Sequence, residues 1–180
     1  KLSRTGHTNW TLTDVDFTDG PYLSPNSTTT TLTPASAAVA TGVNFTASAV
    51  TGINNGDGFQ TTDVGRFISF NSGIAKVTSR TSTTVVVCEI LTAFTNTDAK
   101  SDWKLGAFSD TTGHPSCVSF FEQRLVFAGT TNEPQTLYFS KSGDYENMTT
   151  GTNADDAMVY TIASNQVNRI RYLKAQRTLI

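Results

Sequence analysis

The sequence predicts an all-β fold, and its composition and its turn-forming residues are the observations that predict it. Charged residues make up 16% of the 180 residues, well below the ~25% of typical soluble domains. Thr, Ser, Asn and Gly take their place; Thr favours strands, whereas Gly and Asn favour turns. Ala, Leu, Glu and Lys, which favour long helices, do not dominate. We therefore expect many short strands joined by turns.

The bulk properties argue against two classes of protein. The formal net charge is −2, whereas nucleic-acid-binding domains usually carry a basic excess. No apolar run approaches the ~20 residues that a membrane helix needs. The sequence opens without Met and ends on Arg177-Thr178-Leu179-Ile180, a pattern typical of the start of a strand. Because a strand needs a partner for its backbone groups, we expect a fragment that is truncated at its C-terminus.

Residues 1–33 are predicted to form a turn-rich N-terminal segment that packs with the C-terminal region. Apolar and polar residues alternate over residues 10–13 and again over 14–17, as they do in half-buried strands. Asp19-Gly20-Pro21 is a turn signal. The polar tract over residues 27–31 is expected to be exposed or to form an edge strand.

Residues 34–102 are predicted to form a small inserted β module. Its turn signals are Asn54–Gly58 and the hairpin turn Asn71-Ser72-Gly73. Residues 83–91 form the longest β-branched run, and we expect them in the middle of a sheet because they are apolar on both faces. The other expected strands cover residues 43–46, 64–70 and 74–79. The pattern allows either a small barrel or a two-layer sandwich.

Residues 103–180 are predicted to form a third, β-rich region. A hairpin is expected from strands 117–121 and 124–128 around Glu122-Gln123. Further strands are expected at 136–139 and 157–163, with a break at Ser142-Gly143-Asp144 between them. Residues 167–173 fit both strand and helix spacing; we favour a strand, with Lys174-Ala175-Gln176 as the next turn.

Nothing in the sequence indicates a catalytic, cofactor or metal site. His114 precedes Pro115 in a predicted loop, and neither it nor His7 belongs to a catalytic motif. The carboxylates lie in turn-rich loops, where Asp and Asn are common for conformational reasons. We therefore expect no enzyme activity. The acidic loop clusters are Asp14/Asp16/Asp19, Asp98/Asp102, Asp144/Glu146 and Asp155/Asp156.

Cysteine, aromatic and basic residues are given structural interpretations as well. Cys88 and Cys117 are expected to be buried thiols, because the chain has no cysteine framework. Buried packing is the expected role of the large aromatic residues, and a solvated strand face is the expected role of the C-terminal basic residues. The residues concerned are Trp10, Trp103, Tyr138, Tyr145 and Tyr172 for the aromatic set, and Arg169, Arg171, Lys174 and Arg177 for the basic set.

A long ordered set of motifs fills residues 103–180. These motifs are Trp103–Ser109, Gly113–Ser116, Phe121–Thr130, Pro134–Thr136, Ser140–Asn147 and Val167–Ile170. Together they resemble a stretch of large tail proteins from short-tailed bacteriophages, of the tail tubular protein B or nozzle type. Residues 10–23 fit loosely, and residues 34–102 fit only as a type of insert. The sequence departs from the family at Met148 and His114, where aromatic residues are expected.

The resemblance implies a structural role. Nozzle-type proteins assemble as a ring, usually a hexamer, at the distal end of the tail, where they form a channel for DNA and carry adaptors or fibres. Their folds combine propeller-like sheets with small inserted β domains. Accordingly, residues 34–102 would be a small β-barrel or β-sandwich insert, and residues 103–180 would be propeller-like antiparallel sheet segments of a larger tail-protein platform.

The resemblance also implies partners and a location. The partners would be other copies of the chain, neighbouring tail proteins and fibres, and DNA that passes through without sequence-specific binding. The location would be the virion tail, assembled in the bacterial host cytoplasm. From loop position alone, we expect interaction surfaces at residues 20–26, 130–135 and 143–147.

Two alternatives stay open from the sequence. One is a carbohydrate-binding β module of a tail fibre or secreted glycan-active protein, which would use Trp or Tyr stacking. The other is a fragment of a polysaccharide-degrading enzyme with paired acids.

Overall fold

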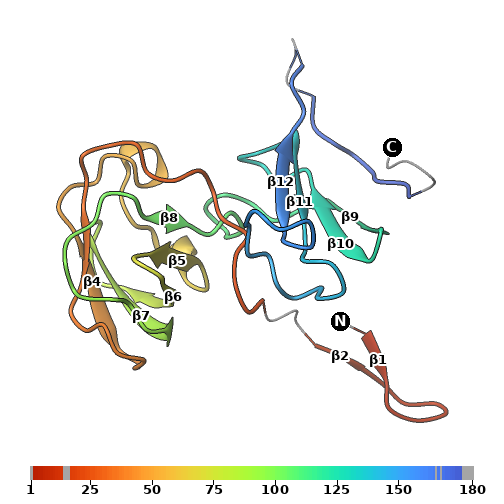
Figure 1. Ribbon diagram of the computed structural model, residues 1–180, viewed down its shortest axis with the longest axis horizontal. Coiled ribbons are helices and arrows are strands. Elements are labelled where there is room, and N and C mark those ends of the chain that lie inside the picture. Colours follow the sequence, from red (N-terminus) through yellow and green to blue (C-terminus); the bar gives the residue numbers. More distant parts are fainter. Residues whose placement is uncertain (1, 14–16, 165, 167, 176–180) are drawn as a thin grey trace.

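The computed structural model describes residues 2–13, 17–164, 166 and 168–175, and within them the chain is all-β, as predicted. Three antiparallel sheets, of two, four and six strands, make up the fold (Figure 1). None of the helices in these residues is long and apolar enough to span a membrane. The strands are β1 (Leu2–Arg4), β2 (Trp10–Leu12), β3 (Leu32–Pro34), β4 (Val43–Ala47), β5 (Phe67–Phe70), β6 (Gly73–Arg80), β7 (Val85–Thr92), β8 (Lys104–Leu105), β9 (Cys117–Phe121), β10 (Arg124–Ala128), β11 (Thr136–Phe139) and β12 (Met158–Thr161).

The six-stranded sheet has the order β3-β4-β7-β6-β5-β8 and curls into a half-barrel. This shape is closer to the predicted barrel than to the two-layer sandwich. As predicted, β7 lies in the middle of the sheet, paired with β4 on one side and β6 on the other. The sheet runs from Leu32 to Leu105, so the predicted module, residues 34–102, leaves out part of β3 and all of β8.

Alternation along the strands builds the larger core. In β4, Val43, Phe45 and Ala47 are buried and the residues between them are exposed, because successive side chains of a strand point to opposite faces. The rings of Phe45, Phe70 and Phe94 pack against one another. An added Cβ on Gly73 would lie 2.4 Å from the Phe94 ring, so this strand start needs glycine.

Two hairpins form at the predicted turns, although Gly73, predicted as part of the first turn, is instead the first residue of β6. Asn71 and Ser72 join β5 to β6, and Glu122 and Gln123 join β9 to β10. All four residues have positive φ angles, between 45° and 63°, as the type I′ turn requires. Residues 64–66, predicted as the start of a strand, instead follow the 3-10 turn η2 (Thr61–Asp63), and β5 begins at Phe67.

The four-stranded sheet is an antiparallel meander of order β12-β11-β10-β9, the unit from which propeller blades are built. Both of its faces are apolar. Val126, Ala128 and Leu137 form a small core with Ile170 and Leu173 on one face. On the other face, Phe108 packs edge-on against Phe127 and Tyr138.

The N-terminal part contributes a hairpin and a strap. Strand β1 pairs with β2, in a hairpin that Figure 1 shows apart from the other sheets. The strap is residues 17–22, which lie against the C-terminal region: Thr18 N–H donates to Glu146 O (2.9 Å), and Asp19 O accepts from Met148 N–H (2.9 Å). The predicted strand at 14–17 falls largely on residues 14–16, which lie outside the described residues.

Two strand predictions need correction. The segment 168–173, predicted as a strand, has no strand assignment. This segment lies across the four-stranded sheet and is held there by isolated hydrogen bonds, such as the one from Ile170 N–H to Pro134 O (2.9 Å), rather than by a strand ladder. The tract 27–31 is neither fully exposed nor an edge strand: Thr30 is buried, and its carbonyl accepts from Trp103 Nε1 (2.9 Å).

Candidate functional site

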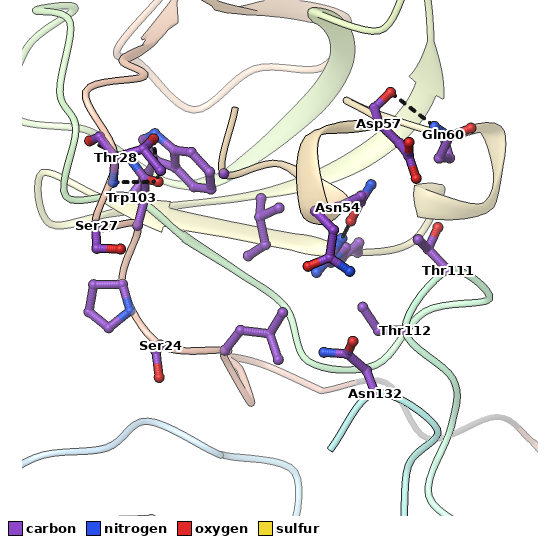
Figure 2. Close-up of a pocket in the computed structure, with 17 residues that line it drawn as sticks. Ser24, Ser27, Thr28, Asn54, Asp57, Gln60, Trp103, Thr111, Thr112 and Asn132 are labelled. Carbon is purple, nitrogen blue, oxygen red and sulfur yellow. Dashed lines mark hydrogen bonds between the residues drawn. The ribbon is translucent and has the colours of Figure 1, made fainter. Parts of the chain in front are cut away.

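A polar cleft of about 340 Å³ lies where the six-stranded sheet meets loops of the C-terminal region. In Figure 2, Ser24 and Thr28 lie on one side of the cleft, Asn54 and Gln60 lie on the other, and Asn132 lies below Thr112. Two of the three predicted interaction loops, residues 20–26 and 130–135, meet here. The third, residues 143–147, does not line the cleft.

A buried ion pair lies behind the inner wall of the cleft. Asp63 and Arg66 are 0% and 2% exposed, and Arg66 Nη1 lies 3.0 Å from Asp63 Oδ1. Arg66 also donates to Asn54 Oδ1 (2.7 Å) and to Gly106 O (2.7 Å). Burial lowers the pKa of Arg66, and the neighbouring Asp63 carboxylate opposes that change. The pair was not foreseen, because an Asp and an Arg three residues apart carry no signal of burial in a sequence.

The carboxylate of Asp63 is fully used by local donors. Its Oδ2 accepts from Gln60 N–H (2.8 Å) and from Asn54 Nδ2 (2.7 Å), which fixes the Asn54–Gly58 turn against η2. Asn26 is equally occupied: its amide nitrogen donates to the carbonyls of Thr28, Thr30 and Ser101. These polar side chains therefore hold the cleft together and offer little to a ligand.

The rim of the cleft is different, because Asn55, Asp57 and Asn132 are exposed there. Such amide and carboxylate groups form hydrogen bonds with hydroxyl-rich ligands. Trp103 lines the cleft but is 3% exposed, so its ring face is not available for stacking.

The predicted titratable residues do not converge on a common site. His114 lies in a loop and contacts Asp110, with Nε2 3.1 Å from Oδ1 and both side chains exposed. His7 contacts Arg4 in the N-terminal hairpin. Among the described residues, no group of three or more His, Cys, Asp or Glu side chains is placed to hold a metal ion. Asp14 and Asp16 lie outside those residues.

Asp19 and the Asp155/Asp156 cluster serve local structure. Asp19 accepts hydrogen bonds from Tyr22 and Thr149, which fastens the strap to the C-terminal region. Lys141 Nζ lies 3.3 Å from Asp155 Oδ2 and 3.6 Å from Asp156 Oδ1. The hydrogen bond from Asn153 N–H lowers the pKa of Asp156, as does the charge of Lys141.

Aromatic residues divide into two groups. Trp103 and Tyr138 are buried, as predicted, whereas Trp10, Tyr145 and Tyr172 are exposed, so the prediction is wrong for these three. Exposure follows from where each backbone lies: Trp10 is on the N-terminal hairpin, and Tyr172 is on the segment that crosses the four-stranded sheet. Tyr145 packs edge-on against Phe120 of β9.

Arg124 organises the C-terminal sheet. Its Nη1 donates to Ser140 O (2.7 Å) and Asp156 O (2.6 Å), and its Nη2 donates to Ala154 O (2.6 Å). The side chain is 7% exposed and ties β10 to the loop that precedes β12. Of the C-terminal basic residues, Arg169 donates to Gly129 O through Nε and Nη2, and Arg171 and Lys174 are exposed. Arg177 lies outside the described residues.

The two outer strands of the four-stranded sheet are its most exposed apolar features. On β12, Tyr160 is 63% exposed and Val159 is 43% exposed; on β9, Phe120 is 59% exposed and Val118 is 58% exposed. Neither strand contains a charged residue or a proline, the usual protections of a free sheet edge. Sequence reasoning placed these strands correctly but did not identify them as edges, because edge position depends on pairing order.

Comparison with known proteins adds no relative. No protein-family model matches the chain, and no curated protein matches it. Function is therefore inferred from the motifs of residues 103–180 and from the geometry above.

Proposed function

We propose that the chain is a structural component of a bacteriophage tail, of the nozzle or hub type, and that it assembles into an oligomeric ring around the DNA channel. The observation that carries this proposal is the pair of exposed, uncharged edge strands, β9 and β12. A sheet with two such edges is suited to contact with further β structure. The motif resemblance of residues 103–180 supplies the tail context.

Other features are consistent with a scaffold. Polar side chains such as Asn26, Asp63 and Arg124 each hold several backbone or side-chain groups in place. A ring of this kind would support adaptors and fibres through its loops and would let DNA pass without sequence-specific contacts. No enzyme activity and no cofactor are part of the proposal.

The mass of the assembled protein tests the proposal. Native mass spectrometry of the purified chain, with negative-stain images of the same sample, should give a closed oligomer and rings with a central hole. A single-chain mass at every concentration up to about 100 μM, within the range where specific assemblies form, would count against a ring-forming role.

Carbohydrate binding is the second candidate, and the rim of the polar cleft favours it. Asn55, Asp57 and Asn132 could hydrogen-bond sugar hydroxyls there, while the buried position of Trp103 argues against stacking at this place. Trp103 nevertheless reports on the cleft that it lines. Titration with oligosaccharides should shift its fluorescence, in a Trp10→Phe background, if the cleft binds glycans.

A further inference from the structure

We propose that copies of this chain join edge to edge, with β12 of one copy pairing antiparallel to β9 of the next. This contact rests on the proposed ring function and is the surface through which the ring would form. The partner is a second copy of the same chain, because the two edges of a single sheet fit each other in direction, hydrogen-bonding pattern and charge.

Direction is the first match. Each neighbouring pair in the four-stranded sheet is antiparallel, so β12 runs opposite to β9. A second copy placed beside β12 in the same orientation therefore presents its β9 antiparallel to β12. The meander continues from copy to copy with no change in its pattern. Such a head-to-tail contact forms a closed ring when the rotation between copies closes.

The hydrogen-bonding pattern is the second match. Alternate residues of a strand bond to opposite neighbours. Ser140 N–H donates to Leu125 O, so Leu125 bonds toward β11, and Arg124 and Val126 bond toward β9. Their partners on β9 are Phe121 and Ser119. By alternation, the backbone groups of Val118 and Phe120 point outward.

The same alternation applies at the other edge. Ile162 N–H donates to Gln135 O, so Tyr160 and Met158 also bond toward β11. The backbone groups of Val159 and Thr161 then point outward. On the outer side of β12, Ala157 N–H, just before the strand, donates to Thr149 O (3.1 Å). Within the described residues, no strand pairs with β12 on this side.

These outward groups fit one another in a common register. Val159 pairs with Phe120 of the next copy, and Thr161 pairs with its Val118, so that each pair exchanges both backbone hydrogen bonds. All four side chains lie on the same sheet face as Phe127, because residues opposite each other in the ladder share a face. The opposite face of the joined sheet is continuous as well.

Charge is the third match. Residues 157–164 and 115–121 contain no Asp, Glu, Lys or Arg, so the contact buries no unpaired charge, which would be costly. The six-stranded sheet of the same chain provides a contrast. Leu32 of its outer strand β3 exchanges backbone hydrogen bonds with Lys100, and Leu105 of its outer strand β8 accepts from Leu23 N–H. Within the described residues, the chain covers the edges of the six-stranded sheet but places no strand beside β9 or β12.

Charge exchange across the predicted register tests the pairing. Val159→Lys and Phe120→Glu are each made alone and then together, with Val39→Lys as the control, because Val39 is 63% exposed and lies outside both edges. Native mass spectrometry and analytical ultracentrifugation measure the mass across concentration. Circular dichroism and thermal unfolding check that each variant is folded.

Each single edge variant should raise the concentration needed for assembly by about 100-fold or more, because it buries one unpaired charge at every contact. The double variant should restore assembly, since the introduced lysine and the introduced glutamate then face each other across each contact. Val39→Lys should assemble like the unmodified chain.

The possible failures are separable. Unmodified chains that form rings, with both single variants retaining the ring mass, would overturn the edge pairing and leave the ring function standing. Loss of assembly in Val159→Lys without rescue by Phe120→Glu would overturn the β12–β9 register in favour of β12 pairing with itself. An unmodified chain that stays monomeric would overturn the ring function and this contact together.

Discussion

The two larger sheets of this protein differ in whether other segments of the chain pair with their edge strands. In the six-stranded half-barrel, Leu32 of β3 exchanges backbone hydrogen bonds with Lys100, and Leu105 of β8 accepts from Leu23 N–H. In the four-stranded meander, β9 and β12 carry exposed apolar side chains and no strand lies beyond them in the described residues. Within the described residues, other segments of the chain thus pair with both edge strands of the half-barrel, whereas no strand pairs with the outer side of β9 or β12.

The hydrophobic cores of the two sheets also differ, and that of the half-barrel is the larger. The half-barrel has a large core, including Phe45, Val86 and Ile90, and a buried ion pair at its margin. The small core of the meander consists of Val126, Ala128 and Leu137, with partly buried residues packed around it. We therefore expect the half-barrel to be the more stable unit, and the following predictions test that difference.

The largest effect is expected when the buried ion pair is broken. Asp63→Ala leaves Arg66 as a buried charge without its carboxylate, and it removes the acceptor for Gln60 N–H and Asn54 Nδ2. The free energy of unfolding should fall by about 3–5 kcal/mol. Urea unfolding, followed through Trp103 fluorescence in a Trp10→Phe background, measures the loss.

Asp57→Ala is the matched control for this change. Asp57 is an exposed carboxylate in the same turn, so its removal should alter the unfolding free energy by no more than about 0.5 kcal/mol. Equal losses in the two variants would show that the pair is not what stabilises the half-barrel margin.

An intermediate effect is expected at Arg124, and it should stay within the meander. Arg124→Met removes three hydrogen bonds and leaves the buried carbonyl of Ser140 without this partner, at a cost of about 2 kcal/mol. Amide hydrogen exchange should accelerate in β11 and β12 while β6 and β7 keep their protection. Arg171→Met, at an exposed arginine, should leave both regions unchanged.

Faster exchange in β6 and β7 of the Arg124→Met variant would contradict the comparison. It would mean that the two sheets open together, as one cooperative unit, rather than with separate stabilities.

The smallest effect on the free energy of unfolding is expected from ionisation of the Cys88 thiol, and it is absent at neutral pH. Burial in the half-barrel core raises the pKa of its thiol to about 12, from an ordinary value of 9.0. Between these values the unfolded chain loses the proton while the folded chain retains it, so the stabilising contribution is full below about pH 9 and is lost as the pH rises toward about 12. Urea unfolding at about pH 8, 9 and 10 measures this decline.

Cys88→Ala should flatten that pH dependence, even though the cavity it creates lowers stability at every pH.

Alkylation compares the two sheets directly. Cys117 lies at the start of β9, where its Sγ contacts Ile170 O, and it should react at a lower urea concentration than Cys88. The reverse order would contradict the ranking of the two sheets.

Elements with local signals could be predicted from the sequence alone. The positions of the hairpins at Asn71-Ser72-Gly73 and at Glu122-Gln123 were predicted correctly, except that Gly73 belongs to β6, because a tight turn depends on the φ angles that its own residues adopt. Strand β4 followed from alternation, and the central position of β7 followed from its long β-branched run. The buried state of Cys88 and Cys117 was also foreseen and is confirmed.

Features that depend on residues distant in the sequence emerge only in the folded chain. The ion pair of Asp63 and Arg66 is buried because the half-barrel and Gly106 close around it. Residues 168–173 have strand-like alternation but no strand assignment. They pack closely against Gly129, where an added Cβ would lie 2.5 Å from Ile170 O, so this position must lack a side chain. Which strands become edges is likewise set by pairing order, since a strand's own residues do not specify its neighbours.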